Sequence, residues 1–86
     1  MTQSAPRAYT RVALWQRFGP PTDQLGSVNE PRTHEEYGVV WNEKWIYRAE
    51  NSEEIERVVL WYRYDFKGAF RVKPDGSTEP ESVPKG

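Results

Sequence analysis

Residues 58–64 read Val-Val-Leu-Trp-Tyr-Arg-Tyr, a run dense in β-branched and aromatic side chains. Such side chains fit the pleated surface of a sheet, so we expect a strand over Val58–Tyr64. Helical spacing is the alternative, with Asn51 or Ser52 as a possible cap for a helix start. We favour the strand because the neighbouring segments have the pattern of hairpins. The residues that also fit helical spacing are Ile55, Val58, Val59 and Tyr62.

The segments on both sides of this run predict four more strands. An alternating pattern precedes the break at Gly19-Pro20-Pro21, and two short runs flank Asn42-Glu43, a candidate tight turn. A further turn is expected over Asp65–Gly68, before the last run. These four strands are expected at Tyr9–Phe18, Tyr37–Trp41, Lys44–Arg48 and Ala69–Lys73.

Five short strands predict an all-β domain, a small five-stranded SH3-like barrel over residues 8–73. Closure into a barrel would bury the rings and protect the sheet edges. The segment Gly19–Glu36 is long for a loop inside a compact domain, and such loops are usually functional. Residues 1–7 are polar and predict a flexible arm. Residues 74–86 carry three prolines and one aliphatic side chain, which predicts a disordered tail.

Composition excludes several classes of function. The 86 residues contain no Cys and a single His, so thiolate chemistry and a His-based metal site are not expected. No phosphate-binding loop, Ser-centred elbow or metal-ligand spacing is present, so we expect no enzyme, no cofactor and no metal. His34-Glu35-Glu36 is better explained as a solvated loop than as a metal site. With no apolar run long enough to span a membrane and no signal-peptide core, we expect a cytoplasmic protein without membrane contact.

Charge is sorted along the chain although the net charge is only -1. Residues 22–56 hold nine acids and three bases, and residues 57–73 hold five bases and one acid. A small surface with many carboxylates and a few large rings suits a basic protein partner. It would repel a nucleic-acid backbone, so direct binding of nucleic acid is not expected.

These observations define a candidate partner-binding set of acids and two tryptophans. Trp41 and Trp45 flank the expected turn, where they could pack across a hairpin or line an exposed pocket, and the residue pattern leaves both possibilities open. Trp15 and Trp61 lie in long β runs and are expected in the core. The candidate partner-binding residues are Asp23, Glu30, Glu35, Glu36, Glu43, Glu53, Glu54, Glu56, Trp41 and Trp45.

The runs Gly38-Val39-Val40-Trp41-Asn42-Glu43-Lys44-Trp45-Ile46-Tyr47-Arg48 and Arg57-Val58-Val59-Leu60-Trp61-Tyr62-Arg63-Tyr64 resemble the CarS antirepressor family. The resemblance covers the whole chain without a diagnostic short motif. It implies an SH3-like barrel that binds the DNA-binding domain of a MerR-type repressor. Such a protein mimics operator DNA, blocks the recognition helix and derepresses carotenoid genes in response to light. We expect it to act as a monomer.

Two other functions stay open from the residues alone. An SH3-like adapter could bind a proline-rich peptide between aromatic rings, with acids of the Gly19–Glu36 segment pairing with a peptide arginine. A nucleic-acid-binding barrel would instead use the Lys and Arg side chains after residue 56 together with nearby aromatic rings. The acidic stretch argues against the latter.

Overall fold

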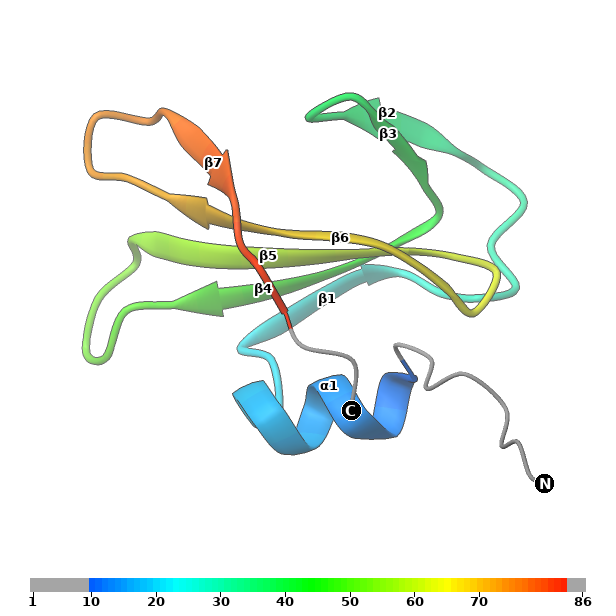
Figure 1. Ribbon diagram of the computed structural model, residues 1–86, viewed down its shortest axis with the longest axis horizontal. Helices are drawn as coiled ribbons and strands as arrows, with labels where there is room; N and C mark the ends of the chain where they lie inside the picture. Colours follow the sequence, from blue (N-terminus) through cyan, green and yellow to red (C-terminus); the bar gives the residue numbers. More distant parts are fainter. Residues whose placement is uncertain (1–9, 84–86) are drawn as a thin grey trace, which may run out of the picture.

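The computed structural model describes residues 10–83, which form one short helix and seven strands (Figure 1). The fold is therefore mostly β, as expected, but it has more strands than the five predicted. Residues 1–7, the expected flexible arm, lie outside the described residues. The elements are α1 (Arg11–Phe18), β1 (Asp23–Gly26), β2 (His34–Glu36), β3 (Val39–Trp41), β4 (Glu43–Arg48), β5 (Ile55–Tyr62), β6 (Asp65–Val72) and β7 (Thr78–Pro80).

The segment expected to be the first strand is helix α1, so that prediction is wrong. The Thr10 hydroxyl caps its start by accepting from the Ala13 N–H at 3.0 Å, and Gly19 ends it with a positive φ of 81°. Capping by Thr and termination by Gly are both typical of helix ends. Leu14 is buried and Phe18, four residues later, is half-buried, which gives the helix one packed face.

The main sheet is antiparallel and contains five strands in the order β1-β4-β5-β6-β7. Because side chains alternate across a strand, its two faces carry different clusters. Trp45, Val59 and Ala69 are neighbours on the adjacent strands β4, β5 and β6, on the face that α1 covers. Leu14 and Trp61 belong to the same cluster. This is the larger of the two buried clusters in the described chain.

The opposite face of the sheet carries the smaller cluster, Ile46, Val58 and Phe70. The β2-β3 hairpin covers it, with Val39 packed on the cluster and the Tyr37 ring 5.0 Å from that of Phe70. The hairpin turns at Tyr37 and Gly38, whose φ angles of 56° and 81° match a two-residue turn with both central residues in the left-handed region.

The predicted hairpin around Asn42-Glu43 is wrong, because β3 pairs with β2 while β4 pairs with β1 and β5. Asn42 and Glu43 are buried at a corner where the chain passes from the small sheet into the large one. The segment Gly19–Glu36, expected to be a long loop, contains β1 and β2.

The strand over residues 58–64 is confirmed as β5, and the helical alternative is excluded there. Its end differs from the prediction, since the turn lies at Arg63 and Tyr64, with φ angles of 48° and 76°. Asp65 already belongs to β6, so the turn predicted over Asp65–Gly68 is wrong. The final predicted strand is the second half of β6.

Residues 74–83 are folded rather than a disordered tail. Residues 78–80 form β7 along β6, and Val83 is buried in the cluster under α1. The carboxylate of Glu81 accepts two hydrogen bonds from Arg57, at 2.7 and 2.9 Å. This segment therefore contributes both an edge strand and a core side chain. Residues 84–86 lie outside the described part of the chain.

The pairing within residues 10–83 does not close into a barrel. β1 and β7 form the two edges of the main sheet, and β2-β3 is a separate two-stranded sheet. No helix within residues 10–83 is long and apolar enough to cross a membrane.

Candidate functional site

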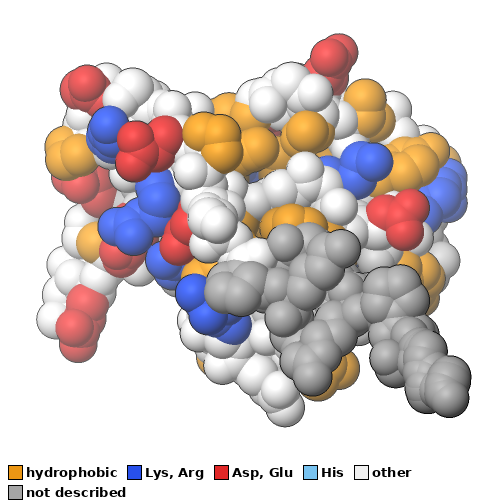
Figure 2. All heavy atoms as spheres, viewed as in Figure 1, with side chains coloured by type: hydrophobic (Ala, Val, Ile, Leu, Met, Phe, Trp, Pro, Cys, Tyr) orange, Lys and Arg blue, Asp and Glu red, His pale blue; other side chains and the backbone are white. Residues whose placement is uncertain are grey.

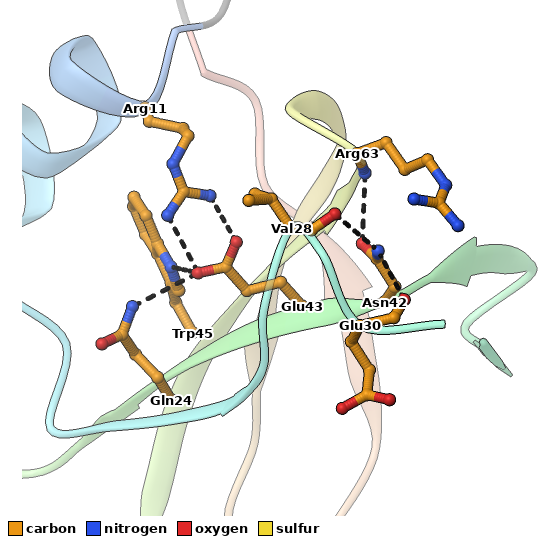
Figure 3. A network of polar contacts seen from close by, with 8 residues as sticks. All are labelled: Arg11, Gln24, Val28, Glu30, Asn42, Glu43, Trp45 and Arg63. Carbon is orange, nitrogen blue, oxygen red and sulfur yellow. Dashed lines mark hydrogen bonds and ion pairs between the residues drawn. The ribbon is translucent and has the colours of Figure 1, made fainter. Parts of the chain in front are cut away.

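The corner between β3 and β4 is organised by the buried amide of Asn42. Its Nδ2 donates to the carbonyls of Val28 and Glu30, at 3.2 and 3.1 Å, and its Oδ1 accepts from the N–H of Arg63 at 3.1 Å (Figure 3). The backbone N–H of Asn42 donates to the Trp61 carbonyl at 2.9 Å. One side chain thus ties the segment after β1 to the β5-β6 turn.

Beside this corner lies Glu43, a buried carboxylate with a side chain only 3% exposed. Arg11 of α1 donates to both of its oxygens, and the indole Nε1 of Trp45 donates to it at 2.9 Å (Figure 3). Gln24 of β1 adds a longer hydrogen bond of 3.3 Å. A buried charge is tolerated only when it is paired and hydrogen-bonded, and Glu43 meets both conditions.

The four tryptophans fall into places that the sequence predicted only in part. Trp61 is fully buried, as expected, but Trp15 is 43% exposed on α1 and packs edge-on against Trp45. The expected core position of Trp15 is therefore wrong. Trp41 and Trp45 are 5% and 1% exposed, so both are buried, and each also forms part of the wall of a surface pocket.

A first group of candidate acids lies on the β2-β3 hairpin. Glu35 and Glu36 line an open groove of about 540 Å³ together with His34, Trp41 and residues of β1 and β4. Glu36 pairs with Lys44 at 2.8 Å, whereas Glu35 has no ion pair among residues 10–83. The His34 ring stacks on Trp41 with centroids 4.5 Å apart, which closes one wall of the groove.

A second group lies at the far end of β4, in the connection from β4 to β5. Glu53 is fully exposed at its side chain, and the neighbouring Glu50 and Glu54 are exposed and unpaired within the described chain. Arg48 is the base that pairs with acids here: its guanidinium nitrogens lie 2.9 Å from a carboxylate oxygen of Asp23 and 4.0 Å from one of Glu53. Carboxylates therefore outnumber bases in this connection.

The remaining candidate acids are more isolated. Glu30 is half-buried, and its carboxylate accepts from the N–H of Arg32 at 3.3 Å. Glu56 is half-buried and has no ion pair among the described residues. The structure therefore splits the candidate set into a hairpin group, a connection group with Asp23 paired to its base Arg48, the covered pair Glu43 and Trp45, and the isolated acids Glu30 and Glu56. A single continuous acidic face does not follow from these positions.

Two of the bases after residue 56 pair with acids of the C-terminal segment. Arg57 pairs with Glu81 at 2.7 Å, and Lys73 pairs with Glu79 at 3.1 Å. Figure 2 shows acidic and basic side chains intermixed at the left of the view, with hydrophobic side chains in its upper centre and at the right. These pairs reduce the local positive charge of β5 and of the segment that follows β6.

Arg11 and Asn42 are the residues of this region that sequence reasoning missed. Arg11 carried no signal because α1 was expected to be a strand, so its distance from Glu43 could not be anticipated. The sequence pattern instead places Asn42 in a candidate tight turn. The signal that could have indicated burial of Asn42 is its place between Trp41 and Trp45, because a polar residue buried with its neighbours needs hydrogen-bond partners inside the fold.

No group of three or more potential metal-ligating side chains is found among residues 10–83. A scan against protein-family models found no match, and searches of curated proteins and of solved structures found no match either.

Proposed function

We propose that this protein is a non-enzymatic antirepressor that binds the DNA-binding domain of a MerR-type repressor through exposed carboxylates. In this proposal it blocks the recognition helix in place of operator DNA and derepresses carotenoid genes. It acts as a cytoplasmic monomer and makes no direct contact with nucleic acid. The single observation that supports it best is the exposed connection between β4 and β5, where three carboxylates lie near one base, Arg48.

The charges of that connection suit a basic helix. Glu50, Glu53 and Glu54 lie in one short exposed segment, and Arg48 is the only base that forms an ion pair with any of them among residues 10–83. A recognition helix carries arginines and lysines placed to meet phosphates, and carboxylates offer the same sign of charge and accept the same hydrogen bonds. Complementary charge speeds encounter and selects the partner more than it raises affinity.

The hairpin group offers a second contact at the other end of β4. β4 has six residues, and a strand rises about 3.3 Å per residue, so the two acidic groups are separated by roughly 20 Å. A helix of about 13 residues spans that length. One basic helix could therefore reach both groups by crossing the exposed edge strand β1, which pairs with β4.

An SH3-like architecture is the finer part of this proposal. Its support is the packing of the β2-β3 hairpin over one face of the main sheet, on Ile46, Val58 and Phe70. A proline-rich ligand, the alternative from the sequence, has less in its favour. The exposed rings of Trp15, Tyr37 and Tyr64 come from three different segments.

A gel mobility assay tests the proposal, with a MerR-type repressor bound to its operator and titrated with this protein. Loss of the repressor–DNA band, without any shift of DNA by this protein alone, is the expected result. An unchanged band would refute antirepression of that repressor. A shift of free DNA would show that this protein binds nucleic acid directly. That result would favour the alternative that uses the Lys and Arg side chains after residue 56.

A further inference from the structure

Helix α1 does not have the features of a helix that is stable by itself. It has eight residues, and isolated helices below about 12 residues are marginal in water. Its first turn contains no acid and begins with Arg11, a positive charge at the positive end of the helix dipole. The helix therefore depends on its contacts with the sheet, and Glu43 supplies the opposite charge.

The contact that Arg11 makes has the form of an arginine-binding site. Its guanidinium donates to both oxygens of Glu43. The same group lies 5.2 Å from the ring of Trp45, 5.4 Å from that of Trp61 and 5.9 Å from that of Tyr64. A planar guanidinium binds carboxylates in this two-pronged manner and also stacks on aromatic faces, which an ammonium group does less well.

This site is open at its mouth. The Arg11 side chain is 30% exposed although its partner Glu43 is only 3% exposed. Next to it lies a mostly apolar pocket of about 270 Å³ lined by Val12, Trp15 and Trp45. A ligand could therefore approach the edge of the site before α1 leaves it.

We propose that α1 is an internal ligand of this site and can be displaced by a basic helix of the partner. An arginine of the partner then takes the place of Arg11 on Glu43, between the same three rings. The inference rests on the proposed function for the identity of the partner. It gives Glu43 and Trp45 a binding role that becomes available only after α1 moves.

The test uses the full chain and a synthetic peptide with the sequence of residues 10–21. The peptide is added to ¹⁵N-labelled wild-type protein and to the Arg11→Gln variant, and the Trp45 indole N–H signal is followed by NMR. We expect the variant to bind the peptide at least tenfold more tightly than wild type does, because its own helix competes less. A peptide with Arg11→Gln should bind at least tenfold more weakly than the unaltered peptide, and an Arg17→Gln peptide within about threefold of it.

Equal binding of the Arg11→Gln and unaltered peptides, or no binding of either at millimolar concentration to a folded variant, would overturn the proposal. If the variant does not fold, hydrogen exchange of wild type decides. The Trp45 indole and the α1 amides should then exchange through a smaller opening than the amides of β5, and simultaneous exchange of all of them would overturn the proposal. Neither experiment contains a repressor, so failure here leaves the antirepressor proposal standing on the exposed acids.

Discussion

Replacing Glu43 should destabilise the fold more than any other acid substitution among the candidate residues. The carboxylate accepts two hydrogen bonds from Arg11, one from Trp45 and one from Gln24. Glu43→Gln keeps the shape and one acceptor oxygen but removes the charge. Hydrogen bonds to charged groups contribute about 1.5–3 kcal/mol. Because Arg11 is partly exposed and can turn toward water, we expect a loss of about 2 kcal/mol.

Glu43→Ala should cost more, because the Trp45 indole and the Arg11 guanidinium then both lose their main acceptor. Breaking a buried ion pair from one side costs about 3–5 kcal/mol. A chain of 86 residues has a total stability of roughly 4–13 kcal/mol. The alanine variant should therefore lose a large part of the total stability, and it would be partly unfolded at 25 °C if the wild-type stability lies at the low end of that range.

Urea unfolding followed by tryptophan fluorescence and circular dichroism measures both losses. Glu79→Gln is the matched control, because Glu79 forms an ion pair with Lys73 in which both side chains are about half exposed. Such surface pairs contribute less than about 1 kcal/mol. If Glu43→Gln and Glu79→Gln shift the midpoint equally, the buried network does not hold α1 as described.

Three further predictions concern the fold and its pH dependence. Gly26→Ala should cost more than about 2 kcal/mol in urea unfolding, since φ is +70° and a Cβ would lie 2.2 Å from the Asn42 carbonyl oxygen. Gly76→Ala, with φ +90° and open space, should cost about 1–2 kcal/mol, and equal losses would contradict the close approach. Burial raises the pKa of Tyr47 to about 12, with Arg57 opposing the shift, so this group stabilises the fold below pH 10 and loses that contribution as the pH rises to 12. Tyr47→Phe should flatten the stability profile over that range, and an unchanged slope would refute this. Val83→Ala should cost roughly 1–3 kcal/mol, and a loss near zero would place Val83 outside the core.

The central strands were predictable because their side chains leave few alternatives. Val58, Val59, Leu60 and Trp61 are all nearly inaccessible, and a segment buried on both faces has the continuous apolar run that the sequence shows. Antiparallel pairing with the following run then required only a turn. The observed turn lies before the predicted one, at Arg63 and Tyr64. Both residues have positive φ although neither is glycine, so the sequence carries no glycine signal for a turn there.

Helix α1 was missed because its short sequence fits two periods. Val12 and Leu14 alternate as in a strand, whereas Leu14 and Phe18 lie four residues apart as in a helix. Only packing separates the two patterns, since Leu14 is buried and Val12 is 66% exposed. The cap at Thr10 and the glycine at position 19 were the local signals that favoured the helix.

The C-terminal segment was missed because composition outweighed a short turn signal. Asp75-Gly76 lies between β6 and β7, and an Asp-Gly pair is a common hairpin turn. The Asp75 carboxylate accepts from the hydroxyl and the N–H of Ser77, and these hydrogen bonds lower its pKa. The single aliphatic residue of the segment, Val83, is the one that reaches the core.

The charge pattern of the sequence led to the candidate acids, but it did not predict where they lie in the fold. The acidic stretch does contain exposed acids that form no ion pair with any other residue of 10–83, such as Glu35 and Glu54. Which acids stay free depends on residues distant in the chain, since Arg11 covers Glu43 from 32 positions away. Ion pairs between residues so far apart in the sequence cannot be predicted before the fold is known.

The most direct test of the antirepressor account is the association rate between this protein and the repressor's DNA-binding domain, measured by stopped flow at two salt concentrations. The variant Glu53→Lys/Glu54→Lys should associate about tenfold more slowly at low salt, with a smaller difference at high salt. The control Asp65→Lys/Glu79→Lys has the same net charge change at other exposed positions and should stay within about threefold of wild type. Equal rates for the two variants would contradict recognition through the connection between β4 and β5.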